Sequence, residues 1–168
     1  MVVLRCTRKL RRHLSDGGTA PEPSRSTGVL GDWFANVLIV RRQHIVLAVS
    51  GVTLLPVLVP AAPYKTMVPR LAEAVGQILR ALRIPADMVG AEQEAMRDAV
   101  MATTNDRRVR GSMNDLAFMA DGYLQDLSLH DAALKLAEAP CSPLGMNNPR
   151  EATRARFSVP TLRLVKGR

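Results

Sequence analysis

The uncharged run of residues 45–62, IVLAVSGVTLLPVLVPAA, constrains the fold of this chain more than any other segment. Its 18 residues approach the length of a membrane-spanning helix. However, Ser50-Gly51 stands at its middle, Pro56 interrupts its second half, and much of the rest is β-branched, which favours strands. The run therefore predicts two short strands around a two-residue turn, and no membrane span.

The preceding residues extend this pattern to three strands, over 33–40, 44–49 and 52–59, with a polar turn at Arg41-Arg42-Gln43. Strands joined by turns this short must be antiparallel, because parallel neighbours need a long crossover. Pro56 has no amide donor, so the third strand is expected at an edge of the sheet or to contain a bulge there.

Helical periodicity follows the Pro60–Pro63 break and predicts a helix over about 64–83 and a second after Pro85 that includes residues 99 and 100. Ser112 and Asp115 resemble a capping box that opens a third helix, and Ser128 and Asp131 repeat the pattern for a fourth. Residues 2–5 look like a strand, followed by a basic turn capped by Thr7. The expected fold class is α+β: a small antiparallel sheet, made of the N-terminal strand and a three-stranded meander, packed against about four helices.

The 168 residues fit a single domain with a sizeable core. We expect this α+β domain to cover residues 1–148, with an exposed loop at 15–28, where glycine and proline are frequent and large apolar side chains are absent. Residues 149–168 are expected to form a basic C-terminal tail with one short strand near 157–165.

The formal charge of +8 is concentrated at the two ends of the chain. Residues 1–13 hold five basic residues and no acidic one, and residues 150–168 hold six basic residues and one acidic one. The middle of the chain holds 12 basic and 14 acidic residues, so it is nearly neutral. Basic ends can attract nucleic acid or an acidic membrane, but they are also common as solvated tails.

Cys6 and Cys141 are too few for a disulfide framework, and neither lies at metal-ligand spacing from a partner. The basic N-terminal segment is not followed by an apolar run of signal-peptide length. We therefore expect a cytoplasmic protein with reduced cysteines, no metal site, no cofactor and no membrane partner.

The segment TTNDRRVRGSMND, residues 103–115, concentrates polar side chains before a predicted helix. Arginine forks near a helix start suit a phosphate or a partner's carboxylate. The candidate binding residues are Arg107, Arg108, Arg110, Asn105, Ser112 and Asn114, together with Arg41 and Arg42 of the hairpin. The alternative is a structural corner, in which Asn105, Asp106, Asn114 and Asp115 satisfy backbone groups while the arginines pair with acids of neighbouring helices.

Catalytic motifs are not recognisable in the sequence. Ser112 lacks the second glycine of a hydrolase elbow and is explained by a helix cap. His13, His44 and His130 are scattered, and Gly17-Gly18 matches no nucleotide-binding loop. Trp33 and Phe34 are the candidates for stacking on a base, although aromatics at a strand start are more typical of core anchors.

Three segments, VLRCTRKL, LGDWFANVLIVRRQHIVLAVSGVTLLPVLVP and TTNDRRVRGSMNDLAF, continued by LSLHDAALKLAEAPC, resemble an uncharacterised bacterial family known only as a domain of unknown function. The resemblance covers residues 2–141. The family pattern favours Asn at Ser50 and an apolar residue at Arg110, which weakens a family-wide phosphate role for Arg110. The resemblance implies no activity or cofactor, but it does imply that the polar segments 31–36 and 103–115 are family features.

Three functional hypotheses remain. The first is a non-catalytic protein that binds nucleic acid or phosphate through its basic ends and the arginine segment. The second is a protein-interaction module, such as an inhibitor or accessory subunit, with a Met-lined helix face or an acidic partner. The third is a small nuclease that uses Asp32, His44 or Asp115. We favour the first, because local charge is the only functional signal in the sequence.

Overall fold

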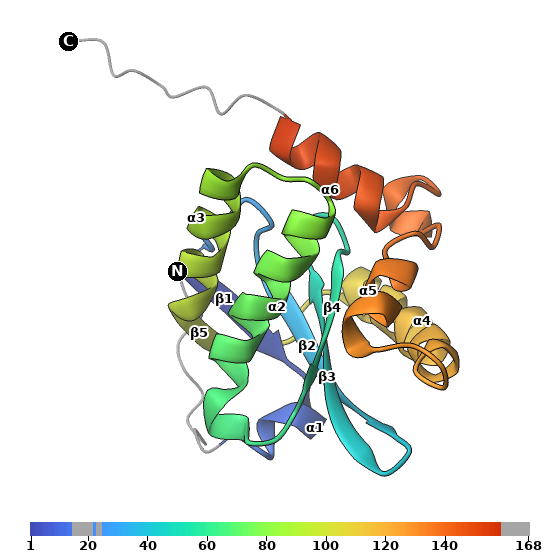
Figure 1. Cartoon of the computed structure of the whole chain (residues 1–168). Helices are drawn as coiled ribbons and strands as arrows, with labels where there is room; N and C mark the ends of the chain where they lie inside the picture. The colour runs from blue at the N-terminus through green and yellow to red at the C-terminus, as the bar shows by residue number, and fades with distance from the viewer. Residues whose placement is uncertain (15–21, 23–24, 159–168) are drawn as a thin grey trace, which may run out of the picture.

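A computed structural model describes residues 1–14, 22 and 25–158 and confirms the α+β class (Figure 1). The elements in chain order are β1 (Val2–Cys6), α1 (Arg8–Arg11), β2 (Trp33–Val40), β3 (Gln43–Ser50), β4 (Pro56–Pro60), the 3-10 turn η1 (Tyr64–Thr66), α2 (Met67–Ala81), α3 (Ala86–Arg97), β5 (Ala99–Thr103), α4 (Arg107–Tyr123), α5 (Leu129–Leu136), the 3-10 turn η2 (Ser142–Leu144) and α6 (Pro149–Ser158).

The predicted antiparallel meander is present as β2, β3 and β4. Val40 lies opposite Gln43, so the first turn contains only Arg41 and Arg42, both at positive φ (48° and 66°). Such a two-residue turn matches the right-handed twist of the flanking strands. The second connection is longer than the predicted two-residue turn, because the Ser50 hydroxyl accepts hydrogen bonds from the Val52 and Thr53 amides and β4 begins only at Pro56.

The sheet is mixed, and the expectation that it is antiparallel throughout was wrong. Its order is β4-β3-β2-β1-β5, and β1 runs parallel to both of its neighbours. The chain from Cys6 to Trp33 is long enough for the crossover that a parallel pair requires. The sequence also missed β5: residues 99 and 100 were assigned to a helix that in fact ends at Arg97.

The helices cover both faces of the sheet. α2 and α3 pack on one face, α4 packs against β2 and β3 on the other, and α5 packs against the β4 edge (Figure 1). Residues 45–50 of β3 are buried without interruption, as expected of a strand covered on both sides. Most of the apolar run of residues 45–62 therefore lies inside the core. Within the described residues, no helix combines the length and the apolar composition that crossing a membrane requires.

Residues 149–158, expected to begin an irregular tail, form α6 instead. The Thr153 hydroxyl donates a hydrogen bond of 2.9 Å to the Thr53 hydroxyl, and Phe157 is 7% exposed, so this helix packs on the domain. The strand expected near 157–165 is not formed at 157 and 158, which are helical, and the rest of it lies outside the described residues. Most of the predicted loop at 15–28 also lies outside them.

Candidate nucleic-acid interface

The arginine segment forms the start of α4, and the N-cap lies six residues earlier than predicted. Asp106 is the N-cap, and its carboxylate accepts hydrogen bonds from the amides of Arg108 (2.8 Å) and Val109 (3.3 Å). The proposed capping role of Ser112 was wrong, since Ser112 lies inside the helix and is 7% exposed. Asp106 is the N-cap, and Ser112 is not, because Asp106 is the last residue with extended backbone before the helix.

Arg107, Arg108 and Arg110 are exposed on the first turns of α4. None of them forms an ion pair with a described residue, so the alternative in which they neutralise acids of neighbouring helices is not what the structure contains. Cations near a helix N-terminus are also unfavourable for the helix itself, by a few tenths of a kcal/mol each. Helix stability therefore does not explain their position.

One exposed strip of residues, called here the α4 strip, runs along the outer face of α4. Arg107, Gly111, Asn114 and Phe118 are spaced by three or four residues, and all four are exposed. Phe118 is 85% exposed, the highest value among the large apolar side chains of the described residues. An added Cβ at Gly111 would meet nothing within 4 Å, so the line is open to solvent at that point. The strip thus presents an aromatic ring beside a cation and an amide.

The β2–β3 hairpin brings a further predicted residue to this strip. The Arg41 guanidinium donates to the side chain and the main-chain carbonyl of Gln125, just beyond the end of α4. From Arg107 to Gln125 the axial rise is about 27 Å. The strip therefore has arginines at both ends. Arg42, in contrast, lines a hollow beside His44.

The other predicted residues fall into two groups, which are exposed polar residues and buried aromatic residues. Asn105 is exposed just before the N-cap, and Asn114 lies on the strip. Trp33 (0% exposed) and Phe34 (4%) are core residues and cannot stack on a base. Sequence reasoning missed Phe118, although it falls outside the apolar stripe of its own helix and could have been assigned to the outer face for that reason.

The basic ends of the chain contribute less exposed charge than their composition suggests. Arg5 is 6% exposed and donates to Asp32 (2.7 Å), Glu22 (2.7 Å) and the Thr103 carbonyl (3.2 Å). In α6, Arg150 and Arg154 each form ion pairs with acidic side chains, and Arg156 donates to a backbone carbonyl. The N-terminal cations left exposed are Arg8, Lys9 and Arg12.

Two of the predicted nuclease residues, Asp32 and His44, lie far apart in the structure. Trp33 pairs with Ser50 and Ile39 with His44, so Asp32 and His44 lie about 20 Å apart, at opposite ends of the same strand pair. Among the described residues, no cluster of three potential metal ligands exists. Both thiols are buried, and burial raises the pKa of Cys6 to about 12 and also raises the pKa of Cys141. Neither is suited to act as a thiolate nucleophile.

An aromatic cluster that the sequence did not reveal joins α1, β3 and η1. The His13 ring stacks on Tyr64 at 4.7 Å, and its centroid lies 5.6 Å from that of His44. The His44 Nδ1 lies 3.1 Å from the Tyr64 hydroxyl. These contacts fix the start of β3 against the residues that follow β4, which is a sufficient structural reason for them.

This mixed five-stranded sheet covered by helices on both faces defines a small α+β domain. The chain belongs to the family described as Domain of unknown function (DUF6933), whose model matches residues 3–152. The match extends from β1 into α6 and so includes the α4 strip. No curated protein and no solved structure is significantly similar to the chain.

Proposed function

We propose that the protein binds nucleic acid through the outer face of α4, without catalysing a reaction on it. The observation that carries the proposal is the 85% exposed Phe118 in one line with Arg107 and Asn114. Arginine guanidinium groups recognise phosphate oxygens in a fork geometry, and an aromatic face stacks on any base. Burying Phe118 beneath a base also removes a large apolar side chain from water, which the folded chain alone does not do.

The charge distribution favours a single strand over a duplex. Asp115 and Asp121 are exposed on α4 between the cationic ends of the strip, so phosphates are attracted at the ends and repelled near the middle. A single strand can turn its bases toward Phe118 at the middle and its phosphates toward the arginines. A duplex presents phosphates along its whole length and stacks its bases internally.

The proposal includes a bacterial, cytoplasmic location. Single-stranded nucleic acid is accessible to a protein there, and the two buried cysteines would stay reduced. A methionine-lined interaction face gains less support from the structure, because Met67, Met96 and Met113 are core residues.

A titration of fluorescein-labelled, unstructured 12-nucleotide DNA and RNA at two salt concentrations tests the proposal. The double variant Arg107→Ala/Arg108→Ala should weaken binding and lower the salt slope by about one to two. Arg83→Ala is the control, since Arg83 is exposed, lies two residues beyond the end of α2 and forms no ion pair with a described residue. Absence of binding at low salt, or equal loss in the control, would rule the proposal out.

A further inference from the structure

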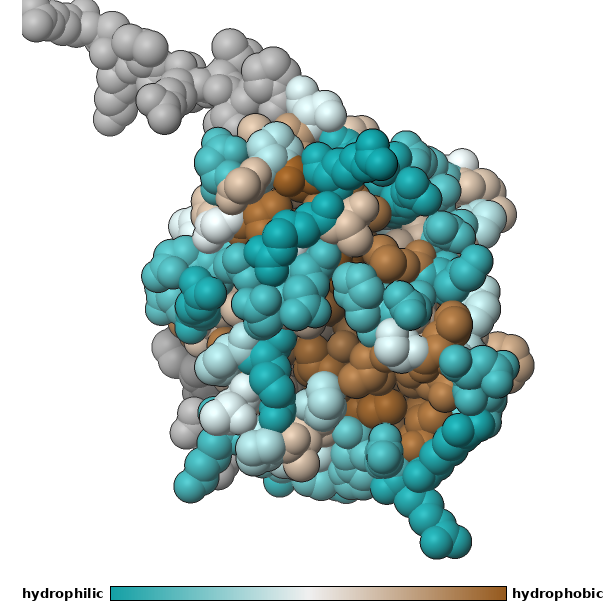
Figure 2. All heavy atoms as spheres, in the orientation of Figure 1, coloured by the Kyte–Doolittle hydropathy of each residue, from teal (hydrophilic) through white to brown (hydrophobic). Residues whose placement is uncertain are grey.

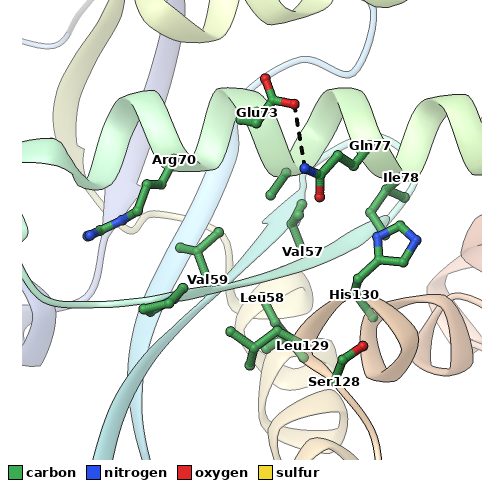
Figure 3. Close-up of a pocket in the computed structure, with 13 residues that line it drawn as sticks. Val57, Leu58, Val59, Arg70, Glu73, Gln77, Ile78, Ser128, Leu129 and His130 are labelled. Carbon is green, nitrogen blue, oxygen red and sulfur yellow. Dashed lines mark hydrogen bonds between the residues drawn. The ribbon is translucent and has the colours of Figure 1, made fainter.

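A groove follows the outer edge of β4, between α2 and α5. Its volume is about 410 Å³, and its floor includes Leu58 and Val59 of β4. Figure 3 shows Arg70, Glu73 and Gln77 of α2 on one side, and Ser128 and Leu129, at the start of α5, on the other. Figure 2 shows hydrophobic residues, in brown, exposed in this region within a largely hydrophilic surface.

The register of β4 determines which of its backbone groups face the groove. The Ala61 amide donates to the His44 carbonyl (2.9 Å), and the Ser50 amide donates to the Leu55 carbonyl (3.1 Å). Because hydrogen-bonded pairs alternate in an antiparallel ladder, residues 57 and 59 also bond to β3. The N–H and C=O of Leu58, and the C=O of Pro56 and of Pro60, therefore point away from the sheet.

These outward groups are left unpaired at the floor of an apolar groove. Among the described residues, no turn, loop or side-chain group hydrogen-bonds to the Leu58 N–H or C=O. Leu58 is nevertheless only 4% exposed. A shielded backbone donor and acceptor without partners carry a desolvation cost that an added strand would relieve.

The two prolines restrict what can pair with this edge. In a second copy of β4 placed antiparallel around Leu58, Pro56 would lie opposite Pro60, and neither has an N–H to donate. The carbonyl groups of these prolines would then face each other on both sides of the pair formed by the two Leu58 residues. A strand with an N–H opposite each proline can instead donate to both carbonyls, so the edge rejects its own copy and accepts a different sequence.

The open end of the groove is cationic. Toward Pro60 it continues into a second hollow of about 520 Å³, lined by Arg42 and His44 and sharing Pro60 and Leu129 with the first. Arg42 is exposed here and forms no ion pair with a described residue. An acidic group would complement this end, whereas apolar side chains suit the floor.

We propose that the β4 groove binds an extended segment of another protein, which adds a strand to the edge of β4. The segment has free N–H groups opposite Pro56 and Pro60, apolar side chains toward the floor and an acidic side chain near Arg42. Main-chain hydrogen bonds supply affinity in this mode of recognition, and the side chains supply specificity.

The test starts from selection of a phage-displayed library of random 12-residue peptides on the full chain. Counter-selection uses Ala74→Trp, because Ala74 lines the groove from α2 and a tryptophan there would fill it. Ala91→Trp is the matched control on the exposed side of α3. The expected result is a set of apolar, acidic peptides that lose at least tenfold in affinity with Ala74→Trp, lose about fivefold with Arg42→Glu and are unaffected by Ala91→Trp.

Pairing with the edge is tested on the peptide, which leaves the fold of the protein untouched. Single N-methylation along a selected peptide should weaken binding about fivefold or more at every second position and little at the positions between. Failure to enrich any peptide over the Ala74→Trp protein, or an N-methyl profile without this alternation, would overturn the proposal. So would a dimer in sedimentation that Ala74→Trp converts to monomer, because the groove would then hold a second copy.

Discussion

Replacing Phe118 with alanine separates the contribution of this side chain to binding from its contribution to folding, because the ring is almost fully exposed. With 85% of the side chain already in water, its removal should change the free energy of unfolding by less than about 0.5 kcal/mol. A base stacked on the ring contributes about 1–3 kcal/mol, so Phe118→Ala should weaken single-strand binding by roughly 5- to 150-fold. Phe118→Trp keeps a stacking face and should bind at least as tightly as the wild type.

Fluorescence polarisation with an unstructured 12-nucleotide probe measures the affinity, and urea unfolding measures the stability. Met146→Ala is the matched control, since Met146 is a 64% exposed apolar residue outside α4. The reasoning is refuted if Phe118→Ala binds as tightly as the wild type, or if Met146→Ala loses as much affinity. A large loss of stability in Phe118→Ala would show that the ring is packed, contrary to the structure.

Other predictions concern the fold. Asp106→Ala removes the N-cap of α4 and should lower the free energy of unfolding by about 1 kcal/mol, measured in urea, while Asp106→Asn should retain most of it. Burial raises the pKa of Glu92, although its carboxylate accepts hydrogen bonds from the Val29 and Leu30 amides. Because the pKa of Glu92 is higher in the folded state, the wild type loses stability as the pH rises from 4.5 through the folded-state pKa. Glu92→Gln does not titrate, so its stability relative to the wild type should increase over the same pH range. Loss of the carboxylate acceptor can still leave Glu92→Gln the less stable protein at every pH. Cys6 should resist alkylation by iodoacetamide at pH 8 until the protein is unfolded, and rapid labelling of the native protein would contradict its burial.

Local patterns in the sequence were sufficient for most individual elements. The meander followed from β-branched runs separated by turn residues, and the Ser128 cap of α5 followed from a side chain that reaches an amide three residues on. Pro56 correctly indicated an edge strand, since β4 ends the sheet. These features depend on residues close together in the chain, and so a local pattern can predict them.

The long-range features could not be predicted in this way. The parallel pairing of β1 with both β2 and β5 depends on contacts across distant parts of the chain, and residues 99–103 are too short and too mixed to be separated from the preceding helix by period alone. Asp106 and Ser112 are both acceptable caps in the sequence. The helix starts after Asp106, whose carboxylate caps it, and Val109 of its first turn packs in the core.

The candidate site was predicted in part. The arginine segment and Arg41 were identified from charge, and the structure places them at the two ends of one helix face. Phe118 was not identified as a site residue. Its place outside the apolar stripe predicts exposure, but its alignment with Arg107 depends on where α4 starts. The groove along β4 was also missed, since it requires the register of the strand and the positions of two helices far apart in the sequence.

Photocrosslinking tests the central claim most directly. A 12-nucleotide RNA containing 4-thiouridine would be irradiated with the full-length protein, and the attached peptide identified by mass spectrometry. Binding through the outer face of α4 predicts that the crosslinks fall within Arg107–Tyr123, centre on Phe118 and disappear in Phe118→Ala. Crosslinks confined to the basic α1 segment, or none at a protein concentration that binds the RNA, would contradict it.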